Sequence, residues 1–195
     1  MTSMAGMAGL GVGPVVAGEE RKAGRRFTLC LACGMIGVSA DPRQLLDWAS
    51  QHGFESVEPP SSFLAGASDA ALGEYRAAMA ARKMVWGAAG LPVDFRGAAA
   101  AFDEGMKSLP RYARSLERAG VTRTATWLTP GHKTLTYLAN FRLHVKRLRE
   151  VSRVLGDHGI CLGLEYVGPK TSWTAHRFPF IHTMAEMKDL IADIG

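Results

Sequence analysis

Short apolar runs alternate with longer amphipathic stretches along the chain from residue 27 onward. Five of these runs have the composition of β-strands and span residues 27–33, 55–60, 84–90, 121–128 and 160–168. After each run, apolar residues recur at helical spacing. Strict alternation of strand and helix favours right-handed crossovers and a parallel sheet with helices outside it. The pattern therefore predicts an α/β fold of five strand–helix units.

Residues with known capping preferences mark the ends of several predicted helices. Asp41 and Pro42 stand at the N-cap and first helical positions of the first helix. Thr183 and Glu186 have the spacing of a capping box at the start of the last helix. Pro110 lies inside the third helical stretch and should kink or break it.

The length of the chain leaves two architectures open. A barrel of eight strand–helix units averages about 250 residues, whereas this chain has 195 and reaches its end after the fifth unit. The five units form either an open five-stranded sheet or the first part of a (β/α)8 TIM barrel. We expect one folded domain over residues 27–195, preceded by a separate segment over residues 1–26.

The N-terminal segment differs in composition from everything after it. Residues 1–18 are rich in Met, Ala, Gly and Val and carry no charged side chain. This composition is typical of the apolar core of a secretory signal, but the basic residues that should precede it are absent. Either translation starts upstream at a complete export signal, which predicts a periplasmic or secreted protein, or the segment is a disordered tail and the protein is cytoplasmic. No later stretch is long and apolar enough to span a membrane.

Charge and cysteine content exclude several classes of protein. The formal net charge is +5 and the pI is near 9.3, a moderate basicity that favours anionic ligands or nucleic acid only weakly. The basic residues Arg142, Lys146, Arg149 and Arg153 recur at helical spacing without interleaved aromatic residues, which indicates a solvated helix face. The three cysteines are too few, and odd in number, for a disulfide framework.

Glu165 is the most informative single residue. It lies in the apolar run 161–168, where an ionised carboxylate is costly unless it is paired or bound to a metal. Cys161 and Gly163, which share its parity along the strand, are small, whereas the alternate residues are large. One face of this strand should therefore open a space into which Glu165 points. A salt bridge to Lys170, or to an arginine of another strand, is the alternative explanation.

Further candidates follow the predicted strands, where parallel α/β folds carry their catalytic groups. Glu58 closes the second strand, so Glu58 and Glu165 could bind a divalent cation or act as general acid and base. His132 follows the fourth strand and could ligate a metal or carry a proton. The long loop after Glu165 contains Lys170, which could bind hydroxyls or phosphate, and Trp173, which could stack on a sugar. Solvated loop positions and local packing are the alternatives for all of them.

The C-terminal part of the sequence resembles a known family. Residues 159–195, with Leu-Gly-Leu-Glu at 162–165 and Gly-Pro-Lys at 168–170, are similar to the fifth strand, loop and helix of the sugar phosphate isomerase/epimerase family. Earlier units also resemble it, so that the resemblance covers residues 27–195. Members of the family are xylose isomerase-like TIM barrels, related to metal-dependent apurinic endonucleases. The resemblance implies a partial (β/α)8 barrel of about five units.

The resemblance also implies roles for the candidate residues. In this family the glutamate of the fifth strand binds a divalent metal (Mn, Mg or Zn) and moves a proton beside a sugar carbonyl. Glu165 stands at that position, which makes it the expected metal ligand and catalytic base. Glu58, His132, Lys170 and Trp173 are then the expected sugar-binding residues. The other ligands of the family, an Asp, a His and a second Glu, belong to later strands than the five predicted here.

The activity that the resemblance implies is isomerisation or epimerisation of a sugar by metal-assisted proton transfer in the complete protein. The expected partner is a small sugar or sugar phosphate, nucleic acid is not favoured, and a homo-oligomeric assembly stays open. The alternative is a non-catalytic α/β fragment or binding domain that lacks the full metal site and binds no metal.

Overall fold

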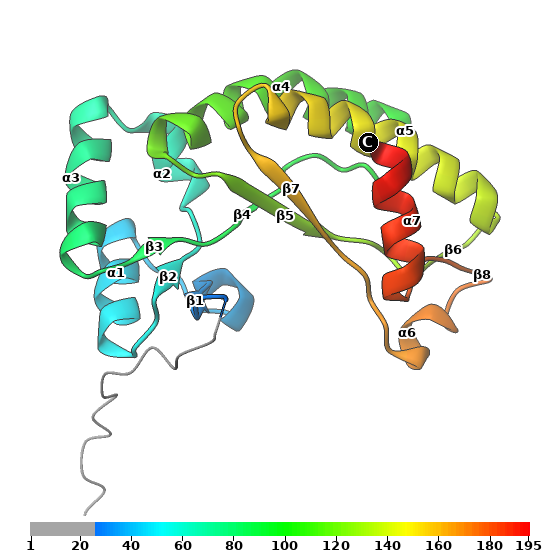
Figure 1. The fold of residues 1–195 in the computed structure, drawn as a ribbon, viewed down its shortest axis with the longest axis horizontal. Coiled ribbons are helices and arrows are strands. Elements are labelled where there is room, and N and C mark those ends of the chain that lie inside the picture. The colour runs from blue at the N-terminus through cyan, green and yellow to red at the C-terminus, as the bar shows by residue number, and fades with distance from the viewer. Residues whose placement is uncertain (1–25) are drawn as a thin grey trace, which may run out of the picture.

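Parallel strands follow one another in the order in which they occur along the chain (Figure 1). The computed structural model describes residues 26–195. The strands of the parallel sheet are β1 (Cys30–Leu31), β2 (Ser56–Val57), β3 (Val85–Trp86), β4 (Ala89–Gly90), β5 (Arg123–Trp127) and β7 (Cys161–Glu165). They pair in the orders β1-β2-β3 and β4-β5-β7, and all of these pairings are parallel. The predicted α/β architecture is confirmed.

The third predicted strand is divided into two parts. Residues 84–90 form β3, which pairs with β2, and β4, which pairs with β5. Gly87 lies at the division, where an added Cβ would collide with the Cys30 side chain and approach the Val57 carbonyl oxygen. One continuous strand was predicted, but the chain leaves one neighbour and joins the other at this point, so that the sheet is interrupted here.

Helices cover one side of the strands. Their bounds are α1 (Pro42–Gln51), α2 (Ser61–Gly66), α3 (Asp69–Ala81), α4 (Ala99–Ala119), α5 (Tyr137–Gly156), α6 (Lys170–Trp173) and α7 (Met184–Ile194), with a short 3-10 helix η1 (Cys33–Ile36) after β1. Figure 1 shows the long helices α4 and α5 side by side, with α1 and α3 near β2 and β3. The predicted capping box is present at α7, where Thr183 and Glu186 cap each other's backbone, and another is present at Asp41 of α1.

Two local predictions were wrong. The first predicted strand ends early, because Cys33 begins η1 and is buried. Pro110 does not break its helix: α4 continues through it to Ala119. Proline removes one hydrogen bond of the helix, but Leu109 and Ala113 on either side of it are fully buried. Packing of both turns against the core outweighs the lost bond.

The apolar core lies between the strands and the helices. The larger cluster joins α4, α5 and α7 to the β4-β5-β7 sheet, and the smaller one joins α1 and α3 to β1 and β2. Fully buried members of the larger cluster include Leu109, Leu116, Leu128, Leu148, Val151, Phe180 and Leu190. The opposite side of the strands carries exposed side chains, and the described strands do not close into a barrel.

None of the helices within residues 26–195 combines the length and the apolar character that a membrane crossing requires. The signal-like segment predicted for residues 1–18 lies outside the described residues.

The buried His144 of α5 should make stability depend on pH. Only 3% of its surface is exposed, its Nδ1 donates to the Asn140 carbonyl oxygen at 2.9 Å, and its Nε2 is buried without a partner among residues 26–195. Burial lowers the pKa of His144 from 6.5 to about 4. The unfolded chain therefore binds a proton that the folded chain excludes, and stability is lost as the pH falls from about 6.5 to about 4.

We predict that His144→Leu removes this part of the acid sensitivity, about 3 kcal/mol over that range. Urea unfolding of both proteins at several pH values between neutral and acid measures it. If the unfolding free energies of the two proteins decline in parallel, His144 is not the titrating group.

Candidate active site

The pairing of β5 with β7 assembles the candidate site. Five consecutive residue pairs are formed, from Arg123 with Cys161 to Trp127 with Glu165. Cys161, Gly163 and Glu165 of β7 are exposed, whereas the leucines between them pack against the core. The predicted open face of this strand is therefore present, and Glu165 lies on it at the carboxyl end.

Glu165 has no charged partner among the described residues. Its backbone carbonyl oxygen accepts a hydrogen bond from the Leu128 amide at 2.9 Å, which extends the pairing of the strands by one residue. Its side chain forms no ion pair with Lys170 or with an arginine within residues 26–195. The salt-bridge explanation for this carboxylate is therefore wrong.

Trp127 is a further candidate site residue, which the sequence reasoning missed. It ends β5, lies directly across from Glu165, and is 50% exposed, which is unusual for so large an apolar side chain. The alternation of Arg123, Ala125 and Trp127 with two buried or half-buried threonines places the indole on the open face. That alternation is visible in the sequence and could have identified Trp127.

Arg96 is the second residue that was missed. It belongs to the loop after β4, and its guanidinium lies over the Trp127 ring with Cζ 4.6 Å from the ring centroid. Its Nη2 donates to the Thr126 hydroxyl at 2.8 Å and to the Trp127 carbonyl oxygen. Burial lowers the pKa of Arg96. No sequence signal links this loop residue to the end of β5.

Glu58 also follows the carboxyl end of a strand, but it lies apart from Glu165. It follows β2 and lines a cavity of about 290 Å³ together with Cys33, Ser39 and Pro60. Burial raises the pKa of Glu58. β2 belongs to the β1-β2-β3 sheet, whereas β7 belongs to the β4-β5-β7 sheet. Glu165 does not line the cavity that Glu58 lines. The structure therefore does not bring Glu58 and Glu165 together on one cation.

His132 lies in a short ladder beyond the end of β5. It belongs to β6 (Gly131–His132), which pairs antiparallel with β8 (Phe178–Pro179). Its Nδ1 accepts the backbone amides of Thr134 at 3.1 Å and Leu135 at 2.8 Å. This ring nitrogen is therefore used to shape its own loop, and a role for His132 in ligand binding stays a prediction.

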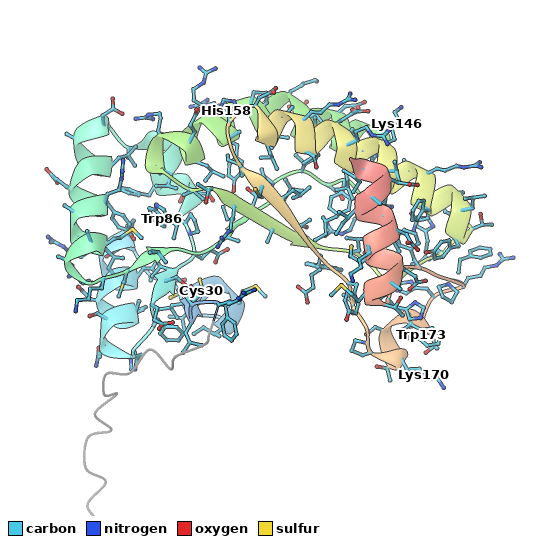
Figure 2. The ribbon with its side chains drawn as sticks, viewed as in Figure 1. Cys30, Trp86, Lys146, His158, Lys170 and Trp173 are labelled. Atoms are coloured by element: carbon cyan, nitrogen blue, oxygen red, sulfur yellow. The ribbon has the colours of Figure 1, made fainter. Side chains whose placement is uncertain are left out.

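Lys170 and Trp173 lie together on α6, beyond the carboxyl end of β7 (Figure 2). The indole of Trp173 stacks on the His182 ring with the two centroids 4.6 Å apart, so that a protein side chain already occupies one of its faces. Lys170 is exposed and forms no ion pair within the described part of the chain. Binding of sugar by either residue stays a prediction.

The described residues do not by themselves fit a divalent metal. Such ions take four or more ligands, and no three His, Cys, Asp or Glu side chains within residues 26–195 converge on one point. Glu165 is a chemically suitable ligand, but the described chain supplies no partner for it.

Comparison with solved structures identifies the fold. A xylose isomerase domain protein from Alicyclobacillus acidocaldarius is 27% identical to the chain, with a TM-score of 0.69 over 86% of this chain and 59% of that one. The described chain has the fold of part of a xylose isomerase-like TIM barrel. The IOLI protein with a bound zinc atom is 16% identical with a TM-score of 0.66, over 86% of this chain and 59% of that one. D-psicose 3-epimerase in the presence of D-fructose is 18% identical with a TM-score of 0.60, over 80% and 55%.

The chain spans less than three fifths of the length of these xylose isomerase-like barrels. The predicted family resemblance and the partial barrel are confirmed at the level of the fold. No protein-family profile and no curated protein matches the chain. In barrels of this kind ligands bind at the carboxyl rim of the strands, which is where Glu165, Trp127 and Arg96 lie.

We predict that Glu58→Gln raises the thermal midpoint of unfolding at neutral pH. A carboxyl whose pKa is raised in the folded state contributes stability below its unfolded pKa, and this is lost as the pH rises through the folded pKa. The gain of the variant should therefore vanish at acid pH, where Glu58 is protonated. Calorimetry at both pH values measures it, with the exposed Glu74→Gln as control. A gain of equal size at both pH values would contradict a half-buried Glu58 that is ionised at neutral pH.

Proposed function

We propose that the rim around Glu165 and Trp127 is part of the active site of a sugar isomerase or epimerase. The observation that carries the proposal is the register of β5 and β7, which sets a carboxylate without an ion pair among residues 26–195 beside an exposed indole. The fold of the chain is similar to the solved structures of D-psicose 3-epimerase and of 3-keto-D-glucoside 4-epimerase, which supports this class of reaction.

In this proposal Glu165 takes the proton from the carbon next to a sugar carbonyl. A carboxylate positioned within hydrogen-bonding reach of that proton acts as a general base. Trp127 packs against the apolar C–H face of the sugar with the part of its ring that Arg96 leaves exposed. The small residues Gly163 and Ala125 beside them leave room for the ring on the open face.

A divalent metal would polarise the carbonyl when bound. Glu165 would be one of its ligands, and the others would have to come from outside the described residues.

A non-catalytic sugar-binding domain is the second candidate. It is favoured by the lack of a converging set of metal ligands within residues 26–195. Such a domain would still bind the sugar against Trp127, but Glu165 would transfer no proton. The two candidates therefore differ in the result of a single exchange experiment.

We predict that the protein exchanges the hydrogen next to the carbonyl of a ketose or aldose with deuterium from heavy water, in the presence of Mn²⁺, Mg²⁺ or Zn²⁺. Glu165→Gln should reduce the exchange rate by at least about 100-fold, the usual contribution of a general base. Proton NMR of a panel of sugars measures the rate.

The matched control is Glu74→Gln, an exposed glutamate of α3 without an ion pair among the described residues. It should exchange at the rate of the unaltered protein. If Glu165→Gln does so too, Glu165 is not the base. If the unaltered protein binds a sugar without exchanging its hydrogen, the non-catalytic binding domain is the correct function.

A further inference from the structure

Behind the rim lies a group of cationic side chains without acidic partners. Arg96 is half-buried and Arg147 is only 6% exposed. Neither forms an ion pair with a carboxylate within residues 26–195. The buried His144 stands near both arginines, and their charges help to keep it neutral. Buried cations are normally paired. Arg147 donates to backbone carbonyl oxygens of the loop, which leaves Arg96 as the cation of this group that is available to an anion.

The loop that carries Arg96 is held in one conformation by specific contacts. The Asp94 Oδ1 accepts the backbone amides of Arg96 and Gly97, both at 3.1 Å. From the helix side, Arg147 Nη1 donates to the carbonyl oxygens of Phe95 at 2.9 Å and Gly97 at 2.8 Å. A Cβ on residue 97 would collide with the Asp94 carboxylate. The position of the Arg96 backbone is therefore set before any ligand arrives.

The guanidinium of Arg96 uses only one of its three nitrogens for protein acceptors. Nη2 donates to Thr126 and Trp127. Nε is enclosed by the protein without a partner among residues 26–195, so no ligand can reach it. Nη1 is not enclosed in this way and donates to no residue in the described part of the chain, which leaves it as the nitrogen that a ligand can reach. The Asp94 carboxylate partly offsets the lowering of the Arg96 pKa by burial, but its hydrogen bonds go to backbone amides. A guanidinium N–H that no protein group uses forms strong, charge-assisted hydrogen bonds with phosphate or carboxylate oxygens. Nη1 of Arg96 is such a donor.

We propose that Arg96 binds an anionic group of the sugar, a phosphate or a carboxylate. This proposal rests on the proposed function of the rim and names its substrate class, an acidic sugar. The Arg96 Cζ lies 4.6 Å from the Trp127 ring, and Trp127 is the direct neighbour of Glu165. A sugar that packs against Trp127 therefore lies next to Glu165 of the neighbouring strand β7. It also lies next to the Arg96 guanidinium, which is beside the indole.

A purely structural role for Arg96 makes different predictions. If Arg96 only holds Trp127 in place, its replacement should weaken the binding of neutral and of anionic sugars equally. If it binds the anion, the loss should be confined to anionic ligands. The comparison between the two kinds of ligand therefore separates the two roles.

The first experiment measures anion binding without turnover. Inorganic phosphate and acetate are titrated at constant ionic strength, and binding is followed by calorimetry and by tryptophan fluorescence, to which Trp127 should contribute because Arg96 covers its ring. We expect saturable binding of at least one anion, which identifies the preferred group. Arg96→Met, which keeps an unbranched chain against Trp127, should weaken it at least tenfold. Arg114→Gln, an exposed position on α4, should leave it unchanged.

Glu165→Gln should bind the anion as well as the unaltered protein does, so that loss of the proposed catalysis and loss of anion binding are distinguishable. Trp127→Phe should bind the anion by calorimetry with a smaller fluorescence change. Arg96→Lys provides a second variant, with the charge but without the planar fork, and should bind more weakly than arginine. The thermal midpoint of each variant checks that it folds.

The second experiment compares a ketose with its phosphorylated form and with the corresponding sugar acid. Arg96→Met should lower binding of the anionic form at least tenfold and leave the neutral sugar within twofold. Equal loss for both forms, absence of saturable anion binding in the unaltered protein, or unchanged anion binding in Arg96→Met would each overturn the proposal.

Discussion

The parallel pairing of β5 with β7 is the constraint on which the candidate site depends. Residues of a strand alternate between its two faces, so that a shift of the register by one residue would exchange the faces. In the observed register Arg123, Ala125 and Trp127 share one face with Cys161, Gly163 and Glu165. The same register turns Thr124, Leu162 and Leu164 toward the helices. The core and the site are therefore fixed by the same set of hydrogen bonds.

The helix layer supports the rim as well as the core. Arg147 of α5 reaches the loop after β4 and holds the carbonyl oxygens of Phe95 and Gly97. That loop in turn sets Arg96 over Trp127. A buried arginine and a buried histidine on one helix are costly unless their contacts repay the loss of water. Here those contacts determine the geometry of a loop at the rim of a xylose isomerase-like fold.

Much of this arrangement could be predicted from the sequence. The alternation of small and large residues around Glu165 placed it on an open face, and local signals such as Asp41 and Thr183 located helix starts, because both depend on near neighbours in the chain. Arg96 could not be found in this way, since its importance arises from contacts with Trp127, thirty-one residues away. The division of residues 84–90 and the continuity of α4 through Pro110 also depend on tertiary packing, which local propensity does not describe.

The accessibility of the face that carries Glu165 can be measured directly on Cys161, which lies on the same strand and the same side. Native protein is treated with iodoacetamide for increasing times, and the modified cysteines are located by peptide mass mapping. Cys33, which is 8% exposed in the core, is the internal reference. If the face is open, Cys161 is alkylated completely while Cys33 is still largely unmodified. Protection of Cys161 to the same extent as Cys33 would show that the face is covered and would contradict the proposed site.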